Sequence, residues 1–437
     1  MGIINFIKGN PLVKSGAKYS LTATAASIVG MIVSLLNMRW IGPSELGIWQ
    51  SLCVVSAYIP FLQLGIQSGL NLDLPVLLGK KDEVKAQRYI ANAFYASIAI
   101  TALILAAGLV ATLFAWLKGM GLKYVFGILA LTIVNAGSSI CSHYIARYRS
   151  SMSFDVLTSI IRIQIVTGVI CVPLIYFWGF WGLLLYNAVP GIVYASFMIR
   201  RSPFADIKPL IIKKDISYLV KRGAIQMLFV QTSTAIKTFP QIFLLGIGGT
   251  IMVGLFSPAL AIKGIVNLLP NQVAQFLIPQ LGYKYGSSSQ AKKIWPYVKK
   301  ILLYMPLLIL PFSLLLFFLL PYLINAFFPK YTESIMAMQI MALGFVFSSS
   351  SITTNFLYTI KGYKEASYII MAEILSYLFF PMFFYKVVGT SVLISTALAV
   401  ASTYFVVYIT TFMVMKVTLF KDKYNNKEME NLNNLFS

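Results

Sequence analysis

The stretch ANAFYASIAITALILAAGLVATLFA, residues 91–115, runs for 25 residues without one charged side chain. A helix that crosses the hydrocarbon core of a bilayer needs about 20 mostly apolar residues, so this stretch is long enough to span a membrane. The whole chain is similar, because 58% of its 437 residues are hydrophobic and only 11% are charged. Soluble domains average about 45–50% apolar and about 25% charged residues. The composition therefore excludes an ordinary cytosolic enzyme and indicates a membrane protein.

Charged and Gly/Pro-rich interruptions divide the chain into further apolar segments of similar length. The pattern predicts an all-α polytopic membrane protein with twelve transmembrane helices. Lysines precede the first span and no small-residue cleavage pattern follows it closely, which predicts a retained span rather than a removed signal peptide. The predicted spans lie at residues 19–37, 47–70, 91–115, 125–142, 156–177, 181–199, 224–245, 252–279, 301–321, 335–359, 368–385 and 392–415.

The charge of the chain is strongly positive, with 35 Lys and Arg against 13 Asp and Glu and a net charge of +22. In a soluble protein this excess would suggest a nucleic-acid partner. Here 27 of the 35 cations lie in the two terminal segments and every second connection, and the alternate connections hold only five. Cytoplasmic loops carry the Lys/Arg excess in membrane proteins. We therefore predict that the chain is embedded in a phospholipid bilayer with both termini in the cytoplasm. We predict no nucleic-acid partner.

The longest basic connection divides the chain into two sets of six spans. We therefore expect an N-terminal six-helix lobe over residues 1–199 and a basic cytoplasmic linker over 200–223. A C-terminal six-helix lobe over 224–415 and a cytoplasmic tail over 416–437 follow. Because six is even, both halves enter the membrane from the same side, so any repeat of one lobe in the other would be parallel.

Four ionisable side chains lie within the predicted spans, namely Arg162, Lys237, Lys263 and Glu373. Charged groups are costly in hydrocarbon, and by default they face the protein interior or a cavity. Lys237 and Lys263 lie near the middle of spans 7 and 8, which predicts a cavity that attracts anions. Arg162 and Glu373 lie about two turns from a span end, where a long side chain can also snorkel to the interface.

Amide side chains accompany these lysines at helical spacing, so that spans 7 and 8 each have a polar stripe. Span 2 has a weaker stripe of the same kind. Small residues on one helix face commonly mediate close packing, but a midspan lysine with polar neighbours favours a cavity wall. The amides expected to line the cavity are Gln63, Gln67, Asn71, Gln226, Gln241, Asn267 and Asn271.

Sequence signatures of catalysis are missing from the chain. Three cysteines and one histidine cannot form a disulfide framework or a Cys/His metal cluster. No phosphate-binding loop, dinucleotide fingerprint, zinc-protease motif or nucleophile elbow occurs. We therefore predict no enzyme activity, no catalytic residue, no cofactor and no metal site.

Three motifs resemble those of a known family. The stretch NMRWIGPSELGIW, residues 37–49, is similar to the Arg, Gly-Pro, Gly pattern at the end of span 1 in polysaccharide exporters of the Wzx type. The basic loop GKKDEVKAQ, residues 79–87, and the connection FPKYTESIMAMQIMAL, residues 328–343, are similar to the corresponding loops of that family. These exporters belong to the multidrug/oligosaccharidyl-lipid/polysaccharide (MOP) superfamily, and the resemblance covers essentially the whole chain.

The resemblance implies a flippase of the bacterial inner membrane with a MATE-like fold, in which two six-helix lobes surround a central cavity. Such proteins move undecaprenyl-pyrophosphate-linked oligosaccharide repeat units to the outer leaflet by alternating access, for the synthesis of O-antigen, capsule or exopolysaccharide. The resemblance also implies that spans 1, 2, 7 and 8 line the cavity. Arg39 matches the family's arginine near the end of span 1, and either ligand binding or loop stabilisation fits it.

The residues and the resemblance together predict a division of labour. We expect Lys237, Lys263, Arg162 and Arg39 to attract the pyrophosphate through charge-assisted contacts and the amides to bind the glycan. Glu373 is the candidate for coupling to a proton or a sodium ion, and a polymerase or chain-length regulator is a candidate partner. Two alternatives are an ion-coupled small-molecule or multidrug antiporter of the same superfamily and a membrane-embedded enzyme or assembly factor of polysaccharide synthesis.

Overall fold

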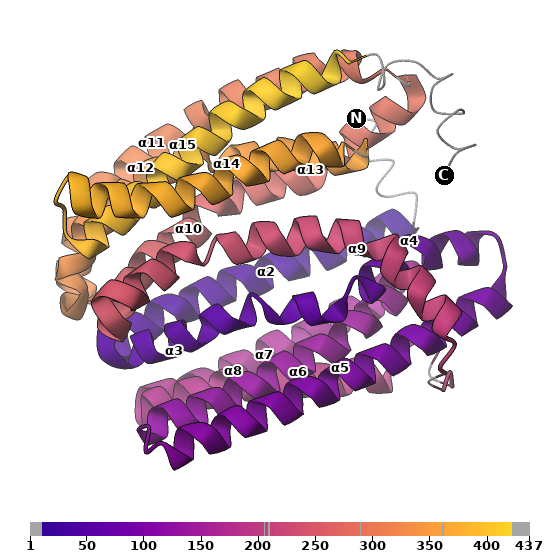
Figure 1. Ribbon diagram of the computed structural model, residues 1–437, viewed down its shortest axis with the longest axis horizontal. Coiled ribbons are helices and arrows are strands. Elements are labelled where there is room, and N and C mark those ends of the chain that lie inside the picture. The colour runs from indigo at the N-terminus through magenta and orange to yellow at the C-terminus, as the bar shows by residue number, and fades with distance from the viewer. Residues whose placement is uncertain (1–10, 205, 209, 289, 361, 422–437) are drawn as a thin grey trace. The chain divides into compact units, whose positions relative to one another are not determined.

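The structure is a computed structural model that describes residues 11–204, 206–208, 210–288, 290–360 and 362–421 (Figure 1). In these residues the chain is almost entirely helical. It forms two compact units, Met1–Ala235 and Ile236–Ser437, which are described separately below. Where the sequence predicts a C-terminal lobe from residue 224, the second unit begins at Ile236.

Helix α6 lies at the centre of the first unit, because α3, α4, α5 and α8 all pack against it. One apolar core joins α4, α5 and the start of α9 around Leu70, Leu74 and Leu219, each completely buried. The helices of this unit are α2 (Pro11–Trp40), α3 (Pro43–Ser56), η1 (Ile59–Gln63), α4 (Ile66–Gly79), α5 (Glu83–Leu117), α6 (Leu122–Ser150), α7 (Phe154–Trp178), α8 (Phe180–Arg200) and α9 (Lys213–Ile236).

Helix α15 has the central place in the second unit, where it packs against α10, α11, α12, α13 and α14. It begins at a capping serine, since Ser391 Oγ accepts a hydrogen bond from the Ile394 amide. The helices of this unit are α10 (Phe239–Ser288), η2 (Ala291–Ile294), α11 (Trp295–Phe327), η3 (Pro329–Ser334), α12 (Ile335–Gly344), η4 (Phe345–Ser349), α13 (Ser350–Thr359), α14 (Tyr363–Met382), η5 (Phe383–Val387) and α15 (Val392–Leu419).

Ten segments of the described chain are long and apolar enough to cross a membrane. Two differences in counting separate this number from the twelve predicted spans. Spans 7 and 8 fall in one long segment, Lys213–Asn267, in which α10 is kinked at Gly249 with φ 69°. Span 10 is divided into α12, η4 and α13, each shorter than a membrane crossing. The prediction of an all-α polytopic membrane protein is confirmed.

Besides span 10, two of the predicted spans are broken rather than continuous. Span 2 unwinds between α3 and α4, where Leu64 and Gly65 adopt left-handed backbone conformations with φ 49° and 84°. Span 7 is interrupted between the end of α9 at Ile236 and the start of α10 at Phe239. Pro240 follows in the first turn of α10, where its missing amide hydrogen costs nothing. The second break leaves Lys237 outside regular helix.

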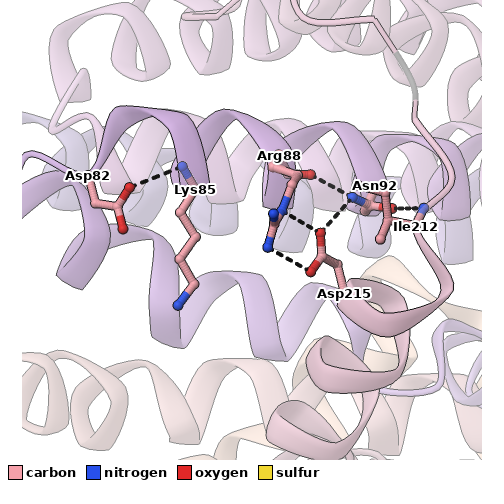
Figure 2. Close-up of polar contacts among 6 residues, drawn as sticks. All are labelled: Asp82, Lys85, Arg88, Asn92, Ile212 and Asp215. Carbon is pink, nitrogen blue, oxygen red and sulfur yellow. Dashed lines mark hydrogen bonds and ion pairs between the residues drawn. The ribbon is translucent and has the colours of Figure 1, made fainter.

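The segment predicted as a linker is attached to the first unit through four residues, here called the α5–α9 anchor: Arg88, Asn92, Ile212 and Asp215. Figure 2 shows that Arg88 binds the buried Asp215 carboxylate through two nitrogens, at 2.7 and 3.1 Å. Asn92 accepts a hydrogen bond of 2.6 Å from the Ile212 amide and donates one of 3.4 Å to Asp215. A bidentate arginine–carboxylate pair fixes orientation as well as distance, so the start of α9 is held on α5.

Glycines allow the backbones of α9 and α4 to approach each other closely. A Cβ atom added to Gly223 would lie 2.0 Å from the Gly65 carbonyl oxygen and 2.2 Å from the Gly69 amide nitrogen. One added to Gly69 would lie 2.2 Å from the Leu219 carbonyl oxygen. Only glycine fits where two backbones approach this closely. The first turns of α9 therefore pack as part of the first unit.

Candidate functional site

The two midspan lysines lie near the buried Glu373 in the second unit. Lys237 lies in the break before α10, Lys263 lies on α10, and Glu373 lies on α14 with 7% of its surface exposed. Both lysines interact electrostatically with the Glu373 carboxylate. No salt bridge joins Glu373 to either lysine among the described residues. Two cations and one anion leave this cluster with one uncompensated positive charge.

Two tyrosines complete the surroundings of Glu373. Tyr377 lies one turn further along α14 and is 4% exposed, and Tyr404 reaches the cluster from α15. Tyr404 interacts electrostatically with Lys237 and Glu373, and its ring packs edge-on against Phe345 at 5.1 Å. Phenol hydroxyls donate and accept hydrogen bonds, so they can serve the carboxylate or a bound anion.

The tyrosines are the site residues that the sequence analysis does not include. The spacing of Tyr377, four residues after Glu373, places both side chains on one helix face and could have indicated it. Tyr404 lies 31 residues after Glu373 in the chain, and only the packing of α14 against α15 brings it near Glu373.

The predicted cationic residues outside this cluster are placed differently. Arg162 is exposed on α7, and Arg39 is exposed in the last turn of α2. The structure therefore brings together Lys237, Lys263 and Glu373, while Arg162 and Arg39 belong to the first unit.

The amides of span 2 bind other parts of the first unit. Gln63 donates to the Ser142 hydroxyl at 3.3 Å, and the buried Gln67 donates to the Ser97 hydroxyl at 2.5 Å. Asn71 is exposed and donates to the backbone carbonyl of Gln67 at 2.9 Å. Hydrogen bonds between membrane helices stabilise packing. These contacts give Gln63 and Gln67 a role in holding α5 and α6 to the broken span.

The remaining predicted amides lie on α9 and α10. Gln226 is half-buried on α9, and its Oε1 atom has no hydrogen-bond partner within the described structure. Gln241 and Asn267 are half-buried on α10. The side chain of Asn271, further along α10, lies outside the described residues.

A second charged group, predicted from the sequence as a loop cation, is buried in the first unit. Arg147 is 1% exposed; it donates to His143 Nε2 at 2.8 Å and to the Phe204 carbonyl oxygen at 3.2 Å. Its guanidinium lies 4.9 Å from the ring centres of Phe94 and Tyr144. Cation–π contacts and these two hydrogen bonds stabilise the buried guanidinium without a carboxylate, while its second terminal nitrogen, Nη2, has no hydrogen-bond partner within the described structure. This group fixes the chain after α8 to α6.

Solved structures of transporters share this architecture. The chain is 14% identical to a multidrug resistance MATE family transporter of the MOP superfamily in an inward-facing conformation, with a TM-score of 0.75 over 91% of this chain and 94% of that one. A MOP superfamily transporter from Pyrococcus furiosus, described by the reverse polarity of its binding pocket, gives a TM-score of 0.67 at 15% identity, covering 97% and 99%. A MATE structure in complex with MaD3S gives 0.66 at 15% identity, covering 96% and 98%. The fold is that of MOP superfamily transporters, which confirms the expected MATE-like architecture.

The sequence identifies the family within this fold. The sequence model described as "Polysaccharide biosynthesis protein" matches residues 38–337, and the chain belongs to that family. No curated protein matches the chain by sequence.

Proposed function

We propose that the protein is a flippase that moves an undecaprenyl-pyrophosphate-linked oligosaccharide from the cytoplasmic to the periplasmic leaflet of the bacterial inner membrane. Membership of the polysaccharide biosynthesis family and the fold of a MOP transporter support this function. The observation that carries it is the cluster of Lys237, Lys263 and Glu373, which has an excess of positive charge within membrane-spanning segments. The lobes would expose the substrate to each side in turn.

The lysines would bind the pyrophosphate, which is the charged part of such a substrate. Contacts between an ammonium group and phosphate oxygens are short and about twice as strong as neutral hydrogen bonds, and a low-dielectric surrounding strengthens them further. The cation excess leaves one lysine charge for the ligand after Glu373 is balanced. In this mechanism Glu373 is also the candidate for exchanging a coupling proton or sodium ion.

A multidrug antiporter of the same superfamily is less well supported. A transporter of cationic drugs needs carboxylates to receive them, whereas this cluster has two half-buried lysines for its one buried glutamate. An enzyme or assembly factor of polysaccharide synthesis would bind the same lipid-linked sugar. An enzyme is therefore distinguished from a flippase by whether the glycan is chemically changed.

Purified protein in liposomes tests the proposal. Lipid-linked oligosaccharide with a fluorescent glycan is placed in both leaflets, and a membrane-impermeant quencher measures how much of it remains inside. We expect protein-dependent transfer of a glycan whose mass is unchanged. A glycan of altered mass would show an enzyme instead, and transfer no faster than in protein-free liposomes would contradict the flippase.

A further inference from the structure

A cavity of about 720 Å³ lies inside the first unit, among α2, α5, α6, α7 and α8. Small-molecule sites typically occupy about 300–1,000 Å³, so the cavity is large enough for a ligand. None of the described residues that line it is Asp, Glu, Lys, Arg or His. It is therefore chemically unlike the lysine cluster of the second unit.

Polar groups of two adjacent helices line this uncharged cavity. The Gln164 amide on α7 and the Tyr186 hydroxyl on α8 have no hydrogen-bond partner among the described residues. Asn187 donates to the Leu183 carbonyl at 2.8 Å and keeps its Oδ1 atom available. Polar groups within a membrane-spanning bundle are costly unless a partner satisfies them. Water or a ligand must supply the partners that the protein does not.

Glycines form the other part of the wall. Gly30 on α2, Gly137 on α6 and Gly191 on α8 line the cavity. Apart from the adjoining backbone of its own helix, no heavy atom of the described residues lies within 4 Å of the position where each Cβ would be. Glycine in a membrane helix usually permits close packing of a neighbouring helix. Since no helix fills these positions, packing does not explain them. They leave backbone open to a ligand that approaches closely.

We propose that this cavity binds sugar residues of the oligosaccharide. The proposal rests on the proposed function and extends it to the uncharged part of the substrate. Amide and phenol groups both donate and accept hydrogen bonds, as sugar hydroxyls do. A charged ligand would find no counter-charge here and would lose its hydration. The tyrosine ring adds an apolar face beside the polar groups.

Binding of the two halves of the substrate to purified protein tests this assignment. The probes are inorganic pyrophosphate and the free oligosaccharide, which mild acid releases from the lipid-linked pool of the source organism. We expect Gln164→Leu to weaken oligosaccharide binding at least tenfold and to leave pyrophosphate binding unchanged. Gly191→Leu, whose side chain would begin at an open Cβ position in the cavity wall, has the same expected effect. Gly246→Leu is the matched control, because Gly246 is equally open and lies in the second unit.

A labelling experiment provides a second readout that does not depend on the affinity of a variant. Ser138 is exposed and lines the cavity, so Ser138→Cys should react with a small thiol reagent, and free oligosaccharide should slow the reaction. Ser217→Cys, exposed on α9, should react at the same rate with and without the sugar. Thermal unfolding identifies any variant that does not fold.

The outcomes separate this inference from the proposed function. Unchanged oligosaccharide binding by folded Gln164→Leu and Gly191→Leu, or no protection of Ser138→Cys, overturns the cavity assignment even if the protein transfers lipid-linked oligosaccharide. Failure of transfer in liposomes overturns the flippase, and sugar-specific loss of binding in the two variants would still support a saccharide site.

Discussion

At the scale of single residues, the buried Glu373 explains how two lysines can remain in a membrane-spanning unit. Isolated charges are expensive there, and a carboxylate that interacts electrostatically with two ammonium groups reduces that cost for each of them. The hydropathy pattern identifies Lys237, Lys263 and Glu373 as ionisable side chains within apolar segments. It does not show that they meet, because α10 and α14 are far apart in the chain.

Removing the carboxylate tests this balance of charge. We expect Glu373→Gln to lower the free energy of unfolding by about 1–3 kcal/mol, because two half-buried cations then lack a counter-charge. The measurement is the thermal midpoint in detergent. The double variant Lys263→Met with Glu373→Gln restores the net charge of +1 and should recover most of the midpoint. Equal midpoints for the single and double variants would contradict the charge balance.

At the scale of helices, hydropathy predicts where the membrane crossings are, and packing decides where they break. Twelve apolar segments are visible because each must be long enough to cross the bilayer. The left-handed backbone at Gly65 cannot be predicted from its neighbours in sequence. It occurs where Gly223 of α9 packs closely against it, and Gly223 is far away in the chain. The polar start of α9 is likewise predicted as part of a linker, because its partners Arg88 and Asn92 lie more than 100 residues earlier in the sequence.

The α5–α9 anchor predicts a specific loss of stability. We expect Asp215→Asn to cost about 1–3 kcal/mol, because the buried residue loses its charge-assisted bonds to Arg88. Hydrogen exchange at the start of α9 should increase. Asp82→Asn is the control: Asp82 caps α5 through the Lys85 amide, and asparagine caps a helix about as well as aspartate. Equal exchange in the two variants would show that the anchor does not hold α9.

The crossing of α4 and α9 predicts opposite effects for two glycine substitutions. Gly223→Ala should lower the thermal midpoint, because the added methyl group meets backbone atoms of Gly65 and Gly69 that have no room to move. Gly16→Ala should leave it unchanged or raise it, because an added Cβ meets no described heavy atom within 4 Å beyond the adjoining backbone, and alanine favours helix by about 1 kcal/mol. A stable Gly223→Ala protein would argue against the close crossing.

At the scale of the whole molecule, the large positive net charge of the chain does not by itself indicate the charge of its ligand. Most of the cations lie in alternate connections, where they predict orientation. The few within the spans are the ones that bear on the substrate. This distinction is available from the sequence, but the tyrosines around Glu373 and the uncharged cavity of the first unit depend on tertiary packing.

The sign of the substrate charge predicts a response to membrane potential. Moving one negative charge outward across an inside-negative membrane is favourable by about 2.3 kcal/mol per 100 mV. We therefore expect export of lipid-linked oligosaccharide in liposomes to accelerate when a potassium diffusion potential makes the cytoplasmic side negative. The reversed potential is the control and should slow it. Equal rates under both potentials would indicate that no net charge moves.

The most direct test of the central claim measures leaflet transfer by two lysine variants. We predict that Lys237→Ala and Lys263→Ala, present in liposomes at equal amounts, reduce transfer of lipid-linked oligosaccharide at least tenfold. Lys221→Ala, which removes an exposed lysine of α9, should transfer at the rate of the unsubstituted protein. Full transfer by both folded variants would contradict the assignment of the lysine cluster to the pyrophosphate.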